Sequence, residues 1–497
     1  MNQKEKTNQL LVVKTDILLA YLLVVAGAII YISLTFNNNV WLDEAFTATL
    51  VNGSFKEVLD RSMADTLPPL YNLLLRLTTL IFGYRVPVMK ITSAVPMIIT
   101  MILGATTVRR RFGAITSYIF ILAVTFMPNM MFYGVEIRMY SLGFLFATAS
   151  GIYMYEVLLE PTLKNWCIFT IVSVLAGYSH HFAFVTVGFV YLFLLIVSIR
   201  NTLLYKKSEP GIAPAKINIK SFLLCVLATF ILYFPCLLTT LKQLKSVSGY
   251  FSMPEVTLSV FAKYCRYPFT VGFTPLSGIL LVLIFVLYFI TLLKKNKTLK
   301  DYYSLWCLII FYGVLLFGTL VSKIMTANIF VDRYLFFALG LVWLFFSISI
   351  GTSKSKFIYA VFVLEIAVGI VSYKDALSSE YAKGADTLTE FLKANVSEGD
   401  ALYTLEDYEE LAYCLPFYDN DFTNYEDLQE AVDNSQGNTI WCAVLDGYDI
   451  SGKHPDGNLG YKAYVEEIEA LGYEMIKEGD FTFDRYSFKL YTLKKGL

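Results

Sequence analysis

The chain has 497 residues, of which 56% are hydrophobic and only 16% are charged. A soluble globular domain carries about 25% charged residues, so this composition excludes an ordinary soluble globule. The apolar residues form continuous runs instead of alternating with polar ones, which argues against an outer-membrane β-barrel. Length and composition therefore predict a polytopic α-helical membrane protein.

The formal net charge of −1 conceals two very different parts of the chain. Residues 1–373 contain 30 basic and 15 acidic side chains, and residues 374–497 contain 10 and 26, which add up to the 40 and 41 of the whole sequence. We predict a membrane domain at 1–373 and a soluble domain at 374–497. Basic residues of the first part lie in short loops beside apolar runs, where they face lipid headgroups and indicate no nucleic-acid partner.

About eleven apolar runs in the first part are predicted to cross the bilayer as helices. The fifth of them is short, so its limits are the least well defined. The runs lie at 17–34, 86–107, 114–132, 139–159, 166–180, 182–199, 221–240, 274–293, 302–321, 334–351 and 356–373.

The basic clusters all fall on the side of the predicted bundle that holds the N-terminus. They lie before the first run, at Arg109–Arg111, between 200 and 220, at 294–300 and at 354–356. Because basic loops stay in the cytoplasm, the N-terminus is predicted to be cytoplasmic. An odd number of spans then places the C-terminal domain outside a multi-pass protein of the cell membrane.

The first outer loop, about 36–85, is predicted to contain two short helices. Ser54 and Glu57 have the spacing of a capping box at the start of an amphipathic helix. Pro68 and Pro69 then open a second helix, since proline is tolerated in a first turn. Two short helices with apolar faces beside a bilayer are expected to lie in its interface plane.

The C-terminal domain alternates strand and helix patterns and is predicted to be a small α/β layer structure. Cys414 and Cys442 both lie in it and could pair if it faces an oxidising space. No glycine-rich phosphate loop or metal-ligand spacing is present, so a catalytic role of its own is not expected. Strands are predicted at 401–405 and 439–445, a strand pair at 481–494, and helices at 385–393, 406–415, 425–432 and 461–471.

Acidic residues are scarce in the membrane part, and four of them gather in two outer loops. Ionisable groups at a membrane boundary are costly, so a functional role is the default hypothesis for them. For Asp43 and Glu44 the alternative is a helix cap, because both residue types suit a helix N-terminus. The candidates are Asp43 and Glu44 in Trp-Leu-Asp-Glu-Ala, Asp65 in Asp-Thr-Leu-Pro-Pro-Leu-Tyr, and Glu136 in Glu-Ile-Arg-Met-Tyr, which also holds Arg138 and Tyr140.

Arg138, Lys323 and Arg333 are cations in predicted outer turns, where basic residues are uncommon. An arginine fork can bind two phosphate oxygens at once, which suggests a clamp for the phosphate of a lipid. The alternative is a headgroup anchor, with Tyr334 beside Arg333 as part of an aromatic belt.

His180 and His181 end the fifth predicted span on the outer side. Adjacent residues do not share a helix face, so a metal site made from this pair alone is weakly supported. We expect a polar cap of the site, or one histidine that binds substrate.

Taken in order, these motifs resemble the GT-C glycosyltransferases, and in particular the group of dolichyl-phosphate-mannose–protein mannosyltransferases and aminoarabinose transferases. The resemblance rests on Trp-Leu-Asp-Glu-Ala, Asp-x-x-Pro-Pro-Leu-Tyr, Glu-x-Arg-Met-Tyr, Tyr-Ser-His-His-Phe and Asp-Arg-Tyr, and it covers essentially the whole chain. One position departs from it: the family usually has His or Lys directly before Pro-Pro, and this chain has Leu67.

The resemblance implies a sugar donor linked to polyprenyl phosphate and an acceptor hydroxyl that arrives from the outer side. It implies Asp43 as the base, with Glu44 and Asp65 orienting the acceptor or a divalent cation. The chemistry requires cations near the leaving phosphate, here Arg138, Arg333 and Lys323. Asp43 and Arg138 are then expected to line one outer cavity.

Several alternatives stay open. The sequence does not name the sugar, and the acceptor could be a protein, a glycolipid or a cell-wall polymer. The competing hypotheses are a transporter or lipid flippase, which would place ionisable groups near the bilayer midplane, and a scaffold whose outer domain binds a partner.

Overall fold

The computed structural model describes residues 3–205, 217–250, 256–269, 274–325, 329–353, 355–378, 381–404, 409–418, 423–425, 427–435, 438–445, 465–466, 468–483 and 486–495. The chain forms two compact units. The first consists of Met1–Leu34, Gly53–Gly83 and Lys90–Lys374, and the second of Thr35–Asn52, Tyr84–Met89 and Asp375–Leu497. The predicted first outer loop, about 36–85, is thus divided between the two units.

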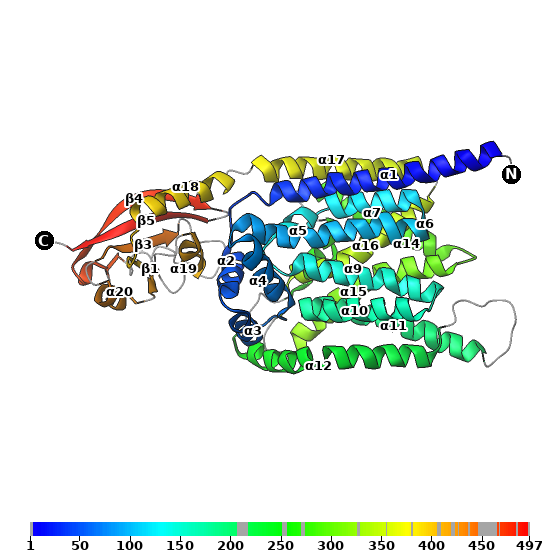
Figure 1. Cartoon of the computed structure of the whole chain (residues 1–497), viewed down its shortest axis with the longest axis horizontal. Coiled ribbons are helices and arrows are strands. Elements are labelled where there is room, and N and C mark those ends of the chain that lie inside the picture. The colour runs from blue at the N-terminus through cyan, green and yellow to red at the C-terminus, as the bar shows by residue number, and fades with distance from the viewer. Residues whose placement is uncertain are drawn as a thin grey trace. The chain divides into compact units, whose positions relative to one another are not determined.

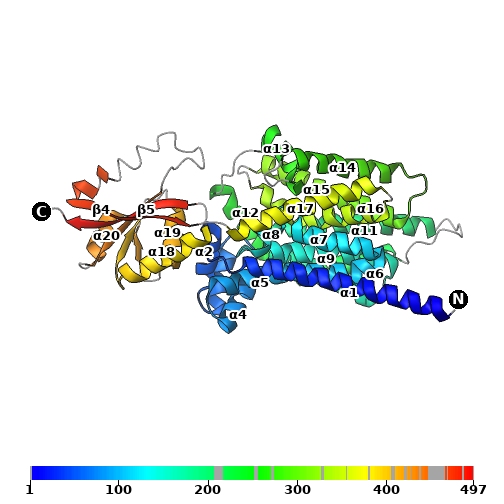
Figure 2. The same ribbon diagram turned by 90° about the horizontal axis from the view of Figure 1, so that it is seen from above.

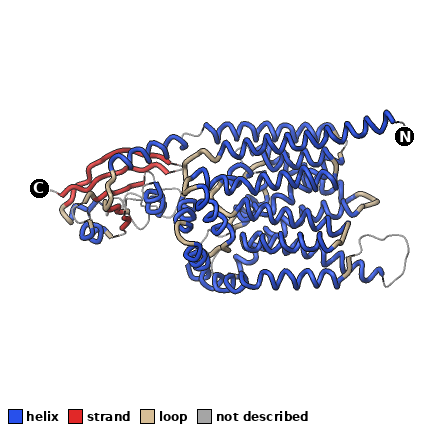
Figure 3. The backbone as a smooth tube through the Cα atoms, viewed as in Figure 1, coloured by secondary structure: helices blue, strands red, loops and turns tan. Residues whose placement is uncertain are grey.

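A bundle of long helices makes up the first unit (Figures 1 and 3). Each predicted span coincides with a helix in the described part of the chain, and Figure 2 shows α1 and α14 on opposite sides of the bundle. The helices are α1 (Gln3–Leu34), α5 (Val86–Leu103), α7 (Ala114–Phe126), α9 (Tyr140–Leu159), α10 (Leu163–Ser179), α11 (His181–Tyr205), α12 (Ile219–Tyr250), α14 (Thr274–Leu293), α15 (Leu299–Ile324), α16 (Phe336–Thr352) and α17 (Lys356–Ser378).

Eight helices among the described residues are long and apolar enough to cross a membrane. The helices α7 and α10 have 13 and 17 residues and are shorter than a usual span. The predicted class, a polytopic helical membrane protein with a small C-terminal α/β domain, is confirmed. The count of eleven spans stays a prediction.

The helices α9 and α16 form the centre of the bundle. Almost every residue of both is buried, and a helix that is apolar all round belongs in such a position. Small residues let their backbones approach closely. A Cβ at Gly340 would overlap the Oγ1, Cβ and Cγ2 atoms of Thr148, so glycine is required at this contact, whereas a Cβ at Gly151 would displace only one methyl group of Leu341.

Short helices lie at the two ends of the bundle. Figure 1 places α6 at the end that holds the N-terminus, and α3 and α4 at the opposite end. Ser54 and Glu57 form the predicted capping box of α3, because the side chain of each residue accepts a hydrogen bond from the backbone N–H of the other residue. The short elements are α3 (Phe55–Ala64), α4 (Leu70–Phe82), the π-helical turn η1 (Gly104–Val108), α6 (Arg109–Phe112), α8 (Met130–Val135), α13 (Leu258–Cys265), η2 (Tyr267–Phe269) and η3 (Asp332–Leu335).

A five-stranded mixed sheet of order β2-β1-β3-β5-β4 forms the second unit together with its helices. β1 pairs in parallel with β2 and β3, and β5 pairs antiparallel with β3 and β4. The elements are α2 (Leu42–Val51), α18 (Tyr381–Asn395), β1 (Ala401–Tyr403), α19 (Glu409–Tyr418), β2 (Thr423–Tyr425), α20 (Leu428–Asn434), β3 (Ile440–Leu445), β4 (Tyr473–Phe483) and β5 (Tyr486–Lys495).

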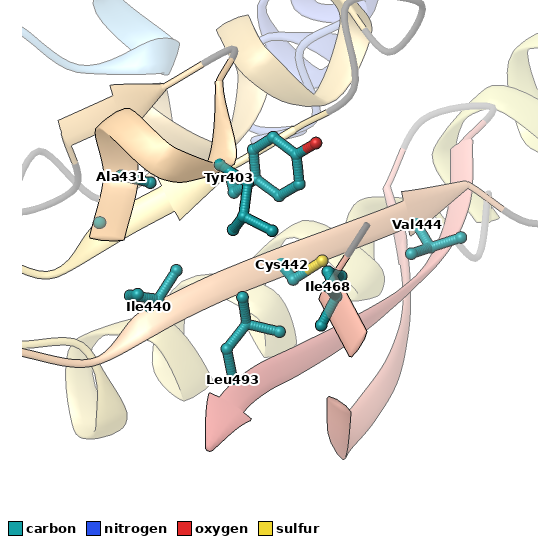
Figure 4. Close-up of a cluster of buried hydrophobic side chains, with 9 residues drawn as sticks. Tyr403, Ala431, Ile440, Cys442, Val444, Ile468 and Leu493 are labelled. Atoms are coloured by element: carbon teal, nitrogen blue, oxygen red, sulfur yellow. The ribbon is translucent and has the colours of Figure 1, made fainter. Parts of the chain in front are cut away.

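The core of this unit lies on one sheet face, where side chains of β1, β3 and β5 meet α20 and Ile468 (Figure 4). The sequence predicted β1, β3 and the hairpin, but it missed β2 and started the hairpin at Phe481 instead of Tyr473. Of the predicted helix at 461–471, residues 465–466 and 468–470 are helical, and residues 461–464 and 467 lie outside the described residues. Cys414 and Cys442 are both buried and are not bonded to each other.

A buried ion-pair network closes the bundle at the end that holds α6. Nε and Nη2 of Arg111 donate to the two oxygens of Glu156, each at 2.7 Å, and Nη2 also donates to Glu160 at 2.8 Å. Arg110 adds a contact of 3.1 Å to Glu156. The side chain of Glu156 is only 3% exposed, so its charge depends on these arginines for compensation.

Replacing this carboxylate should destabilise the bundle. In Glu156→Gln two arginines lose their buried counter-charge, and breaking a buried pair on one side costs about 3 kcal/mol. Glu160→Gln is the matched control, because that side chain is 57% exposed and an exposed pair contributes about 1 kcal/mol or less. Thermal unfolding in detergent should show a clear fall in Tm for the first variant and almost none for the second. Equal Tm values would contradict a structural role for the network.

Candidate functional site

The turn between α8 and α9 presents the predicted Glu136–Tyr140 motif. α8 begins at Asn129, which has φ 68° in the left-handed region that asparagine tolerates better than most residues. Its side chain donates to the carbonyl of Tyr267 at 3.0 Å and so ties the start of α8 to η2. Glu136 ends α8 in an extended conformation, and its carbonyl accepts the N–H of Arg138 at 2.6 Å. The motif therefore forms a tight turn directly after a short helix whose start is tied to η2.

A second turn, η3, brings Arg333 and Tyr334 to the same place. Asp332 accepts the backbone N–H of Arg333 at 2.9 Å, and Lys263 of α13 lies 3.6 Å from the same carboxylate. Arg333 interacts electrostatically with Tyr140 and with His180, and Arg138 does so too. Two arginines that are 195 positions apart in the sequence thus share one region of the bundle.

His180 packs between these turns and is 1% exposed. Its ring centroid lies 4.8 Å from that of Tyr334 and 4.5 Å from that of Phe337. Nδ1 accepts the backbone N–H of Phe182 at 3.0 Å, so a neutral ring carries its proton on Nε2. Among the described residues Nε2 has no hydrogen-bond partner. A buried donor of this kind can be satisfied by an oxygen of a bound ligand.

Two tyrosines that the sequence reasoning missed join this group. Burial raises the pKa of Tyr133 on α8, and the charges of Glu136 and Asp332 raise it further. Burial also raises the pKa of Tyr267, which lies in η2 beside Tyr133 and Asp332. Both phenols therefore keep their protons at neutral pH and can donate hydrogen bonds. The only signal for Tyr133 was its place three residues before Glu136, and Tyr267 gave none.

The Asp65 turn is held by side chains from two bundle helices. Gln243 of α12 donates through Nε2 to the carbonyls of Asp65, at 2.7 Å, and Leu67, at 3.2 Å. Nε2 of His181 lies 3.2 Å from the Thr66 carbonyl and 3.2 Å from Oε1 of Gln243, so this nitrogen is the donor. We call this arrangement the Gln243–His181 clamp. It fixes three successive carbonyls and presents Asp65 at the end of α3.

Asp43 and Glu44 belong to the second unit, on the first turn of α2. Glu44 is buried, and its carboxylate accepts the backbone N–H of Trp41 at 3.2 Å. That bond is the helix-capping arrangement that the sequence left as an alternative for Glu44. Asp43 occupies the second helical position, and its carbonyl accepts the hydroxyl of Thr47 at 2.8 Å. The expected meeting of Asp43 with Arg138 stays a prediction.

The remaining candidate, Lys323, is exposed in the last turn of α15. In the first unit the structure thus brings together Glu136, Arg138, Tyr140, His180, Arg333 and Tyr334, and it places His181 at the Asp65 turn. Within the described part of the chain no group of three His, Cys, Asp or Glu residues is arranged to hold a metal ion.

Comparison with known proteins agrees with the motifs. Residues 66–213 match the family model of dolichyl-phosphate-mannose-protein mannosyltransferases. None of the curated protein sequences matches the chain significantly.

Two solved structures share the fold. ArnT from Cupriavidus metallidurans bound to undecaprenyl phosphate is 12% identical, with a TM-score of 0.59, over 95% of this chain and 97% of that one. The same protein in the apo state gives 11% identity and a TM-score of 0.57 over the same shares. The resemblance to GT-C glycosyltransferases expected from the motifs is confirmed.

The Gln243–His181 clamp should limit the motion of the Asp65 turn. In Gln243→Leu the carbonyls of Asp65 and Leu67 lose their donor, so the turn should open more often. Hydrogen–deuterium exchange should then be faster in a peptide spanning residues 60–72. Gln429→Leu is the control. Gln429 is an exposed residue of α20, and in the part of the chain that the structure describes its side chain hydrogen-bonds only to Asp433. Unchanged exchange in the first variant would contradict the clamp.

Proposed function

We propose that this protein is a membrane glycosyltransferase that transfers a sugar from a polyprenyl-phosphate donor to a hydroxyl of an acceptor. The main support is the group of Arg138, Arg333 and His180 at one end of a lipid-embedded bundle. A fold shared with a protein solved with undecaprenyl phosphate, and the mannosyltransferase family match, agree with this chemistry.

The cations would stabilise the departing phosphate. Negative charge grows on the phosphate oxygens as the sugar–oxygen bond breaks, and fixed cations lower the energy of that transition state. Arg138 and Arg333 supply planar forks for two oxygens each, and Nε2–H of His180 adds a neutral donor. The family usually has His or Lys directly before Pro-Pro, where this chain has Leu67. The two arginines would therefore carry that share of the positive charge.

Asp43 would act as the base that accepts the proton of the attacking hydroxyl. The capping bond of Glu44 to Trp41 leaves Asp43 as the better candidate of the pair. Asp65 would orient the acceptor from the turn held by the Gln243–His181 clamp. A single displacement, with the hydroxyl attacking opposite the phosphate, predicts inversion at the anomeric carbon. The acceptor class, whether protein, glycolipid or cell-wall polymer, is open in this proposal.

Turnover measurements test the proposal directly. Purified protein in liposomes is given radiolabelled sugars on polyprenyl phosphate together with extracts of the cell envelope as acceptor source. We expect transfer by the wild type, and a fall of about 10²–10⁴-fold in Asp43→Asn, the loss typical of a missing base. Arg138→Ala should lose about 10²–10³-fold, the effect of one missing charge-stabilising group.

Lys323→Ala is the matched control for the arginine, because this exposed side chain should affect the rate only slightly. Movement of the intact donor across the bilayer without transfer would favour a lipid flippase. Wild-type rates in Asp43→Asn would remove Asp43 as the base.

We also propose that the N-terminus and the α6 end of the bundle face the cytoplasm. Arg109–Arg111 lie at that end, and basic residues stay on the cytoplasmic side. In a background without the native cysteines, a membrane-impermeant maleimide added to intact cells should label Lys393→Cys in the C-terminal domain. It should spare Lys295→Cys until the membrane is permeabilised. Labelling of Lys295→Cys alone in intact cells would invert the topology.

A further inference from the structure

The segment that leads into α2 is held by the last residue of α19. The Tyr418 hydroxyl accepts the backbone N–H of Val40 at 3.0 Å and donates to the carbonyl of Asn38 at 3.4 Å. Val40 is fully buried and Tyr418 is 9% exposed, so this hydroxyl satisfies a backbone donor that water does not reach.

Further contacts join the same segment to the C-terminal domain. The Asn38 side chain donates to Asp386 of α18 at 2.9 Å, and α19 packs along α2. The Phe417 ring, next to Tyr418, lies 6.5 Å from the ring of Tyr84. Residues 35–52 and 84–89 therefore fold as part of the unit that contains the C-terminal domain, although the membrane part of the sequence surrounds them.

We infer that Tyr418 is a positioning residue for Asp43, and that the C-terminal domain thereby sets the geometry of the transfer reaction. The inference rests on the proposed role of Asp43 as the base. Asp43 lies three residues beyond Val40, on the first turn of α2, and the backbone that enters a helix fixes the direction of that turn. A shift of about 1 Å in a reacting group can cost up to about 10²-fold in rate.

This reading differs from a domain that only recruits acceptors. A recruiting domain would affect the acceptor KM, whereas a domain that places the base affects kcat. The inference rests on the bonds of Tyr418 to Asn38 and Val40. On this inference Tyr418 acts on the base alone, so donor binding should be independent of it.

The test uses the full-length enzyme in liposomes and the variant Tyr418→Phe, which keeps the ring and removes the hydroxyl. We expect kcat to fall about tenfold, with the KM values for donor and acceptor unchanged. Tyr473→Phe is the matched control: it is a half-buried tyrosine of the edge strand β4 in the same domain, and its kcat should match the wild type. An unchanged kcat in Tyr418→Phe, or a change in the acceptor KM alone, would overturn the inference.

Combining variants separates this inference from the proposed function. If Tyr418 acts through Asp43, adding Tyr418→Phe to Asp43→Asn should not lower the residual rate further, whereas an independent tenfold loss would contradict the link. Full activity in Asp43→Asn would instead reject Asp43 as the base. Should Tyr418→Phe fold poorly, Asp386→Ala is the second variant, because it removes the exposed hydrogen bond to Asn38. A kcat about threefold lower, with no such fall in the Asp43→Asn background, supports the inference. An unchanged kcat in Asp386→Ala opposes it.

Discussion

The cost of placing charge and unpaired backbone groups in lipid governs this structure. Each bundle helix satisfies its own backbone, and the sequence keeps most ionisable groups at the helix ends. The charges there are compensated locally, as Glu156 is by Arg110 and Arg111. Chemistry that needs cations and carboxylates can therefore be assembled only at an end of the bundle. Arg138 and Arg333 share such an end because both stand in turns, just before α9 and α16 begin.

The sequence predicted the bundle well because long apolar runs have few alternatives to a helix. It predicted β1 and β3 as well, since both are short, apolar and bounded by polar residues. It missed β2, which has only three residues, and the part of β4 before Phe481. That part contains Glu474, Lys477 and Asp480 and belongs to an edge strand of the sheet, where one face meets water and the apolar pattern is weak. Pairing with β5, a tertiary contact, decides its conformation.

For part of the candidate site, a side chain's own chemistry gave the signal. Charge at predicted outer turns led to Glu136, Arg138 and Arg333 as candidates, and the structure brings these residues together with His180. Gln243 and Tyr418 escaped prediction because their partners are backbone groups of segments more than 170 positions away. No motif encodes such a contact, since any sequence has carbonyls and N–H groups to offer. Tyr267 was missed for a related reason: only the folded chain brings η2 beside α8.

Main-chain contacts hold the segments that carry Asp43 and Asp65. The Gln243–His181 clamp bonds carbonyls around Asp65, and Tyr418 bonds the backbone before Asp43. A hydrogen bond donated to a carboxylate stabilises its charged form and lowers its proton affinity, which weakens a base. The Asp65 carboxylate accepts such a bond from the Thr66 hydroxyl at 3.4 Å, and a residue that only orients the acceptor tolerates it because it takes up no proton. A contact to the backbone fixes the direction of a side chain without acting on its charge, so in the proposed reaction Tyr418 can set the position of Asp43 independently of its proton affinity.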